Sequence, residues 1–263
     1  GIEQDALARL RALGVVLVDT TCGSVLNVWK SVGRYAREGI TSIIHGKVDH
    51  EETRATCSQV LLRGGQYLVV RDFAEGEKLC AQIEGRGDRG RFLDEFSGAY
   101  SPGFDPERDL ERIGLANQTT MLSSESLSIA DALRRSILSR HGEEALSRRF
   151  SSFQTICSAT QDRQDAVEEM LDRRVDMMVV IGGFNSSNTT HLVEIASGRV
   201  PAFHIEGAGD LLGLNQREQP CSPRSMAEQL GESPTYLAKV ARHLVRAGIV
   251  HAPLPAFFTS AQR

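Results

Sequence analysis

Two spacings of apolar residues alternate along the first 205 positions of the chain. In some segments apolar residues recur every three to four positions, which predicts amphipathic helices. These segments are residues 4–13, 25–38, 124–140, 163–174 and 190–197. Between them lie short segments rich in apolar residues, at residues 15–19, 40–44, 66–70, 175–181 and 201–205, which are typical of buried strands. Another strand is expected to end within 115–120. The alternation predicts an α/β fold with a mostly parallel sheet.

Two segments depart from this alternation. Residues 73–112 are polar and rich in turns, so we expect helices joined by surface loops there. The stretch from Gly85 to Gly90 matches G-x-G-x-x-G, but it follows a helical pattern instead of a strand, and we interpret it as a surface turn. Residues 222–250 have helical spacing with no strand signal.

Composition narrows the class of protein. A chain of 263 residues with 41% hydrophobic content can bury a substantial core. A net charge of -4 gives no support for a whole-chain polyanion binder. No apolar run approaches the roughly 18 residues that a membrane span needs, and the first residues resemble neither a signal nor a transit peptide. We therefore expect a cytoplasmic protein with no membrane partner.

The five cysteines are Cys22, Cys57, Cys80, Cys157 and Cys221. Their wide and uneven spacing is unlike the dense pattern of a small disulfide-stabilised domain. In a reducing compartment such thiols are free, catalytic or metal-bound. For each one taken alone, a buried structural thiol is the alternative.

Polar residues follow three of the predicted strands: Thr20 to Cys22, His50 to Glu52, and Gly182 to Asn188. In parallel α/β folds ligands bind beyond the carboxyl ends of the strands, so these segments are candidates for a site. His50 and Glu52 could supply a proton, or could form an ordinary solvated helix start. The Gly-rich loop 182–188 before a helix suits an anion such as phosphate, although ordinary N-capping explains the same residues.

Several segments together resemble the hydroxymethylbutenyl diphosphate reductase (LytB/IspH) family, in its plant and cyanobacterial branch. They occur in the family's order across residues 1–205. The segments are Val-Asp-Thr-Thr-Cys at 18–22, Ile-His-Gly-Lys at 44–47, His-Glu-Glu-Thr at 50–53, Asn-Gln-Thr-Thr-Met at 117–121, Thr-Ile-Cys-Ser-Ala-Thr-Gln at 155–161, Arg-Gln-Asp-Ala at 163–166 and Gly-Gly-Phe-Asn-Ser-Ser-Asn-Thr at 182–189.

The resemblance implies an iron–sulfur oxidoreductase of the non-mevalonate (MEP) pathway of isoprenoid biosynthesis. Such an enzyme converts 4-hydroxy-3-methylbut-2-enyl diphosphate to isopentenyl and dimethylallyl diphosphate by reductive dehydroxylation. It also implies a [4Fe–4S] cluster held by three cysteines, one from each α/β lobe, and an electron donor such as ferredoxin or flavodoxin. By the same resemblance, Cys22 and Cys157 are two of the metal ligands.

The resemblance also assigns roles to other residues. Glu52 would deliver the proton that makes hydroxide a leaving group. His50 and Thr119 would hold the substrate hydroxyl and the proton relay. Binding of the diphosphate would fall to the residues at the start of the last helix: Ser186, Ser187 and Asn188.

The family's multi-lobed, pseudo-threefold fold implies four parts in this chain. Residues 1–22 would be a remnant of a largely missing first lobe, 23–150 the second lobe, and 151–210 a partial third lobe. The family's first cysteine loop has no counterpart here, so we expect an N-terminally incomplete chain without the third cluster ligand, and with impaired activity.

Residues 211–263 would form a helical C-terminal part. Within it, 222–250 resembles the helix-turn-helix of Rrf2-type regulators. The alternatives to an active reductase are thus a DNA-binding regulator of that type and a non-catalytic relic.

Overall fold

The computed structural model describes residues 2–152, 157–173, 175–207 and 210. The chain divides into two compact units, Gly1–Gln161 and Asp162–Arg263, and each is described here by itself. The segment 222–250, where a helix-turn-helix was predicted, lies outside the described residues, as does Cys221.

A four-stranded parallel sheet forms the centre of the first unit. Its strands are β1 (Thr41–His45), β2 (Tyr67–Val70), β3 (Ile113–Asn117) and β4 (Phe150–Ser152), in the order β2-β1-β3-β4. Because all four run in the same direction, their carboxyl ends share one edge of the sheet. The prediction of an α/β fold with a parallel sheet is confirmed.

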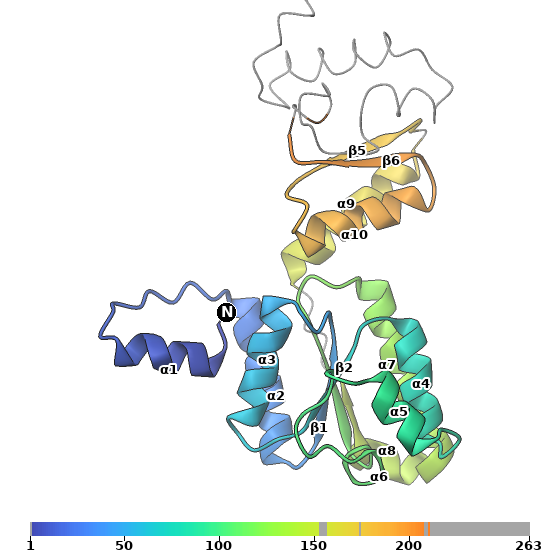
Figure 1. Cartoon of the computed structure of the whole chain (residues 1–263). Coiled ribbons are helices and arrows are strands. Elements are labelled where there is room, and N and C mark those ends of the chain that lie inside the picture. Colours follow the sequence, from blue (N-terminus) through green and yellow to red (C-terminus); the bar gives the residue numbers. More distant parts are fainter. Residues whose placement is uncertain (1, 153–156, 174, 208–209, 211–263) are drawn as a thin grey trace, which may run out of the picture. The chain divides into compact units, whose positions relative to one another are not determined.

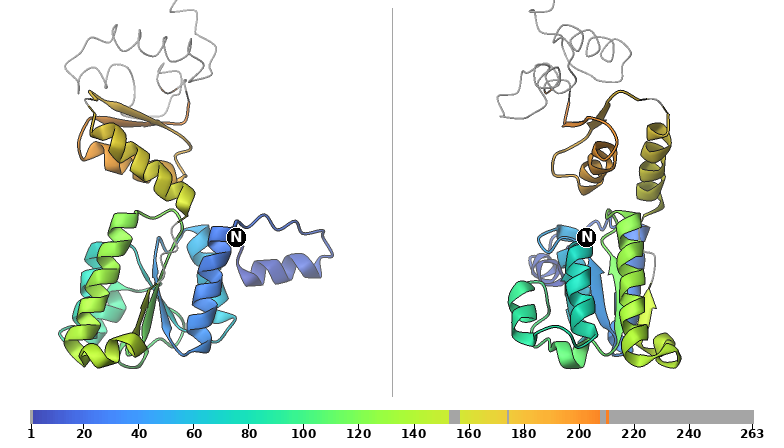
Figure 2. Two further views of the ribbon diagram at one scale, coloured as in Figure 1. Left: turned by 180° about the vertical axis from the view of Figure 1, so that it is seen from behind. Right: turned by 90° about the vertical axis from the view of Figure 1, so that its right-hand side faces the viewer.

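Helices cover both faces of this sheet (Figures 1 and 2), with α2 and α3 on one face and α4 and α7 on the other. The helices of the unit are α1 (Gln4–Ala12), α2 (Gly23–Arg37), α3 (Glu51–Leu61), α4 (Phe73–Ile83), α5 (Arg89–Glu95), α6 (Pro106–Asp109), α7 (Ser123–His141) and α8 (Glu143–Arg149). Residues 85–88 connect α4 to α5, whereas Arg89 and Gly90 already belong to α5. The expectation that a helix precedes the G-x-G-x-x-G stretch is confirmed, and the predicted turn covers its first four residues.

The core of the first unit fills the space between sheet and helices. Ile43 and Ile44 of β1 are fully buried on opposite faces of the sheet, so the strand is covered by helices on both sides. Tyr35 of α2 is also fully buried, and its hydroxyl donates a hydrogen bond to the Leu115 carbonyl at 3.1 Å. Gly114 makes room for it, because a Cβ atom there would lie 2.6 Å from the Tyr35 ring. This packing fixes β1 and β3 and thus the loops at their ends.

The second unit has a strand–helix–strand arrangement. Its strands β5 (Met178–Ile181) and β6 (Ala202–Ile205) pair in parallel, and α10 (Ser187–Ser197) connects them. Helix α9 (Ser158–Leu171) begins at the end of the first unit and continues into the second. Val167 and Leu171 of α9 pack with Met178 and Ala196 in a small apolar core. The predicted strands and helices of this region are confirmed, although α9 begins five residues before the predicted start at 163.

One predicted strand is wrong. Residues 15–19 have no strand structure, and Val16 and Val18 are 92% and 82% exposed. The apolar run favours extended backbone, but a strand also needs a neighbour to accept its hydrogen bonds. None of the strands in the described sheet pairs with this segment.

Two elements were not predicted, α8 and β4. Gly142 separates α8 from α7 with a φ of 79°, a conformation that suits glycine, and the chain then returns to the sheet edge. Among the described residues, no helix combines the length and the apolar character that crossing a bilayer requires.

Candidate active site

Glu52 and Thr119 form the centre of the site at the carboxyl edge of the first sheet. Glu52 lies in the first turn of α3, after β1, and Thr119 lies in the loop after β3. The backbone N–H of Thr119 donates to Glu52 Oε1 at 2.6 Å, and its hydroxyl donates to Oε2 at 2.9 Å. Glu52 is 9% exposed and Thr119 is 5% exposed. The alternative of a solvated helix start therefore does not describe Glu52.

Both oxygens of this carboxyl group have hydrogen-bond partners, because Thr119 donates to each of them. A buried carboxylate without such partners would be strongly destabilising. The arrangement therefore holds a proton-transfer group in one fixed position.

His50 is the N-cap residue of α3, and its ring is oriented by the helix start. Its Nδ1 accepts a hydrogen bond from the Glu52 backbone N–H at 3.2 Å. Because Nδ1 is the acceptor, the hydrogen of the neutral ring is on Nε2, which is then the donor available to a ligand. The structure thus brings the predicted His50, Glu52 and Thr119 to one edge of the sheet.

The loop that carries Thr119 is held by Gln118, a residue to which the sequence interpretation gave no role. The Gln118 side chain is buried, and its Oε1 accepts from the Thr53 hydroxyl at 3.0 Å and from the Lys47 backbone N–H at 3.1 Å. Its Nε2 donates to the Thr120 hydroxyl at 2.8 Å. One side chain therefore ties the β1–α3 turn, the start of α3 and the Thr119 loop together.

Cys157 adjoins this pair. Its backbone N–H donates to the Thr119 carbonyl at 3.3 Å, and the residue directly precedes α9. The pKa of the Cys157 thiol is lowered, mainly by the hydroxyl of Ser24 in the first turn of α2. Backbone N–H groups at the start of α9 lower it further. A thiol with a lowered pKa ionises more readily and is a better metal ligand.

Cys22 lies at the same end of α2, because it is the N-cap residue of that helix and Ser24 follows two positions later. It is exposed, whereas Cys157 is partly buried. The contact between Ser24 and Cys157 therefore places both predicted metal ligands around the N-terminus of α2. Residues 153–156, which include part of the resembling segment before Cys157, are outside the described residues.

The donor set fits part of an iron–sulfur site. Thiolates are the protein ligands of such clusters, and these two cysteines are at helix N-termini that favour negative charge. In the part of the chain that the structure describes, no group of three or more His, Cys, Asp or Glu side chains is arranged to hold a metal. Cys57 and Cys80 do not supply a further ligand here, because both are buried in the core, and burial raises the pKa of Cys57 to about 12.

The Gly-rich loop of the second unit ends in a capped helix. The Ser186 hydroxyl accepts from the Thr189 N–H at 3.3 Å and caps α10. Asn188 Oδ1 is buried and has no hydrogen-bond partner within the described residues. Ser186 therefore caps the helix, as the N-capping alternative predicted. At the helix start, the backbone N–H groups of Ser187 and Asn188 have no partner inside the helix. The loop is thus a capped helix start whose geometry also suits an anion.

His204 of β6 and Glu206, just after this strand, hold the loop, and the sequence analysis did not single them out. His204 Nε2 lies 2.9 Å from the Gly182 carbonyl, and its ring packs against Phe184 with centroids 4.7 Å apart. The Glu206 carboxylate accepts from the Phe184 N–H at 3.0 Å. A strand end that carries His and Glu beside a Gly-rich turn was the available signal.

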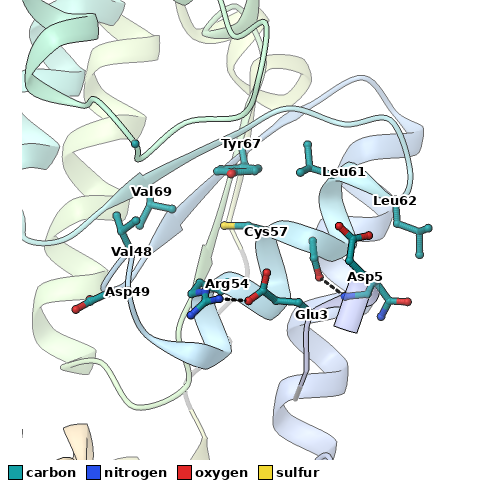
Figure 3. A pocket seen from close by; sticks show the side chains of 13 residues that line it. Glu3, Asp5, Val48, Asp49, Arg54, Cys57, Leu61, Leu62, Tyr67 and Val69 are labelled. Carbon is teal, nitrogen blue, oxygen red and sulfur yellow. Dashed lines mark hydrogen bonds and ion pairs between the residues drawn. The ribbon is translucent and has the colours of Figure 1, made fainter. Parts of the chain in front are cut away.

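A cavity of about 690 Å³ lies away from this site, between α3, the β2 edge and the N-terminal segment (Figure 3). Val48, Cys57 and Tyr67 are among its lining residues, and an ion pair between Glu3 and Arg54 crosses one side. Its lining includes none of the predicted site residues. Its charges are mixed and partly paired, so the chemistry is better placed at the carboxyl edge of the sheet.

Comparisons with known proteins agree with the resemblance seen in the sequence. A relative from Synechococcus sp. (strain RCC307), a 4-hydroxy-3-methylbut-2-enyl diphosphate reductase, is 54% identical over 207 residues, or 78% of this chain and 50% of the relative. A reductase of the same name from Picosynechococcus sp. (strain PCC 7002) is 50% identical over 82% of this chain and 53% of its own length. The chain therefore spans about half the length of these relatives.

A solved structure of the E-1-hydroxy-2-methyl-but-2-enyl-4-diphosphate reductase from Plasmodium falciparum shares the fold. It aligns with a TM-score of 0.61 at 18% identity, over 93% of this chain and 65% of that structure. The family described as LytB protein matches residues 1–242, and this match extends into the segment where a helix-turn-helix was predicted. This match covers most of the chain, which therefore belongs to the LytB protein family.

Proposed function

We propose that this protein takes part in the reductive dehydroxylation of 4-hydroxy-3-methylbut-2-enyl diphosphate to isopentenyl and dimethylallyl diphosphate. One observation carries the proposal: the buried Glu52 carboxyl group is fixed by two hydrogen bonds from Thr119, whose carbonyl accepts from the N–H of Cys157. A proton donor and a thiol suited to metal binding thus lie at one edge of the sheet.

In this proposal Glu52 gives its proton to the substrate hydroxyl, because hydroxide leaves readily only as water. Thr119 holds the carboxyl group in position, and because its hydroxyl hydrogen is donated to Glu52, its oxygen can accept from the substrate hydroxyl. The His50 Nε2–H supplies a further donor on this edge. General acid catalysis by a positioned carboxyl group typically contributes about 10²- to 10⁴-fold to the rate.

Cys22 and Cys157 would be two of the ligands of an iron–sulfur cluster. When bound, such a cluster supplies the two electrons of the reduction. The contribution of this chain is to keep the Cys157 thiol ionisable, because Ser24 and the N-terminus of α9 favour its thiolate form.

The N-terminus of α10 would bind the diphosphate. The hydroxyls of Ser186 and Ser187, the side-chain NH2 of Asn188 and the helix N–H groups can donate hydrogen bonds to phosphate oxygens.

The resemblance supports the remaining parts of the proposal. They are an electron donor such as ferredoxin or flavodoxin, a cytoplasmic location, and the division into parts at residues 1–22, 23–150, 151–210 and 211–263. The comparisons give no support to the alternative of a DNA-binding regulator.

The test compares Glu52→Gln with Glu51→Gln after anaerobic reconstitution with iron and sulfide. Glu51 is the adjacent residue and is exposed, so it is a matched control. We expect both variants to bind iron like the parent protein, and turnover with a chemical reductant to fall about 10²- to 10⁴-fold in Glu52→Gln alone. Equal turnover in all three proteins would refute the role of Glu52. Iron binding with no turnover in the parent would favour the non-catalytic relic.

A further inference from the structure

His45 contacts both ends of the loop that carries Thr119. At the start of the loop, the Gln118 N–H donates to the His45 carbonyl at 2.8 Å, beside the β1–β3 pairing of His45 with Asn117. At the far end, where α7 begins, His45 Nδ1 lies 2.7 Å from the Ser126 hydroxyl, and Nε2 lies 3.5 Å from the Glu125 carboxylate. One residue at the end of β1 therefore holds both the entry and the exit of this loop.

The Ser126 hydroxyl links the ring to the end of the loop. It lies 2.7 Å from His45 Nδ1 and 3.0 Å from the Leu122 carbonyl, to which it can donate its hydrogen. Ser126 in turn fixes Leu122, the last residue of the loop before α7.

Glu125 is held on its other side by α4. Its Oε1 accepts from the Phe73 N–H at 3.1 Å, which leaves Oε2 toward His45. The interaction with His45 is the largest cause that keeps the pKa of Glu125 below its ordinary value. The carboxylate therefore joins the N-termini of two helices to the imidazole.

The side chain of His45 is completely buried, although its neighbours Ile43 and Ile44 show that aliphatic residues fill such places. Burying an imidazole is unfavourable unless its nitrogens have partners. His45 Nδ1 has the Ser126 hydroxyl as its hydrogen-bond partner, whereas Nε2 makes no hydrogen bond within the described residues and lies 3.5 Å from the Glu125 carboxylate. Both groups are at the exit of the Thr119 loop, so the ring specifies the position of that loop more than it adds apolar packing.

We propose that His45 is a positioning residue, which holds Thr119 against Glu52 by fixing both ends of the loop between β3 and α7. It contacts neither Thr119 nor Glu52 through its side chain and acts through the backbone of the loop. The inference rests on the proposed function for the roles of Thr119 and Glu52, but the geometric claim concerns this chain alone.

The test is the hydrogen exchange rate of the Thr119 amide, whose hydrogen is in the 2.6 Å bond to Glu52. In His45→Phe we expect this amide to exchange at least about tenfold faster relative to the core amides of β1, because buried hydrogen bonds of this kind are lost. His45→Asn, whose amide group can donate to or accept from the Ser126 hydroxyl in place of Nδ1, should restore most of the protection.

Ser136→Ala is the matched control. Ser136 is a buried residue of the same helix α7, and its hydroxyl donates to Glu84 at 2.7 Å, away from the loop. Its removal should change Thr119 exchange only as much as the core amides. If His45→Phe does not fold, Ser126→Ala provides the same comparison with a milder change. The proposal would be overturned if the Thr119 amide in His45→Phe or Ser126→Ala changed its exchange rate only as much as the core amides do.

The exchange measurement needs neither cluster nor substrate, so it separates this inference from the proposed function. Faster Thr119 exchange in a protein that never turns over would leave the positioning role intact and count against the reductase. If turnover is lost in Glu52→Gln but kept in His45→Phe, and Thr119 exchange is unchanged in His45→Phe, the role of Glu52 stands and the positioning role of His45 is refuted. In an active protein, His45→Phe should lower kcat and leave KM within a few-fold.

Discussion

Thr119 and Glu52 lie 67 positions apart in the chain, yet Thr119 donates two hydrogen bonds to the two carboxylate oxygens of Glu52. The sheet explains this proximity. Strands β1 and β3 are parallel neighbours with His45 opposite Asn117, so the turn into α3 and the loop before α7 leave the sheet at the same level. The pair is thus a direct product of strand order.

Replacing Thr119 tests how far the carboxyl group depends on it. Thr119→Val removes the hydroxyl bond at 2.9 Å and leaves the backbone bond. We expect the free energy of unfolding to fall by about 1–2 kcal/mol, since one buried acceptor loses a partner. We also expect turnover to fall at least about tenfold, because a less well-held acid transfers its proton less efficiently. Thr119→Ser should retain both properties; denaturant unfolding and a turnover assay measure them.

The Cys157 thiol should ionise at a lower pH than an ordinary cysteine. The Ser24 hydroxyl is the largest cause that lowers its pKa, so the reactive thiolate is present at lower pH. In the metal-free protein, the rate of alkylation at Cys157 should therefore rise at lower pH than that of a cysteine in an unfolded peptide. Ser24→Ala should move this profile to higher pH.

Cys57 is the internal control for that measurement. Burial raises the pKa of its thiol to about 12, so it should stay unmodified across the same pH range while the protein is folded. Mass spectrometry of the alkylated peptides reports both sites at once. A Cys157 profile that is unaffected by Ser24→Ala would show that the hydroxyl does not act on the thiol.

The close approach of β5 to α10 depends on Gly182. A Cβ atom there would lie 2.4 Å from the Thr189 hydroxyl oxygen, so Gly182→Ala must displace the start of the helix. We expect a loss of about 1–3 kcal/mol in the free energy of unfolding, as for other overpacking changes, together with weaker binding of inorganic diphosphate. Gly182→Ala combined with Thr189→Ala should regain part of both. Calorimetric titration with inorganic diphosphate measures the binding. Unchanged binding in Gly182→Ala would contradict an anion site at this loop.

The sequence predicted most of the elements because their patterns are local. The apolar residues Ile43 and Ile44 of β1 and the helical spacing of 124–140 are present in the chain itself, and both elements formed close to the expected positions. The run at 15–19 has an equally clear pattern and is not a strand, because pairing depends on a neighbour that no local pattern contains. Element β4, of three residues, was too short to give a pattern.

The site was predicted in part for a similar reason. His50, Glu52 and Thr119 were recognised from motifs at strand ends, and the structure brings them together. Their supporting residues were not, because Gln118 and His45 act through contacts at separations of 65 and 81 positions that spacing does not reveal. Burial was also decisive for Glu52, since its sequence position alone agreed equally with a solvated helix start.

Direct crosslinking of Cys22 to Cys157 tests the central claim, that these two cysteines meet at the N-terminus of α2. A bifunctional thiol reagent of short reach, such as dibromobimane, is applied to the metal-free folded protein, and linked peptides are identified by mass spectrometry. A variant with Cys57, Cys80 and Cys221 replaced by alanine removes competing thiols. The account predicts a Cys22–Cys157 crosslink in this variant, lost when either cysteine becomes serine. Labelling of both thiols without a link between them would contradict it.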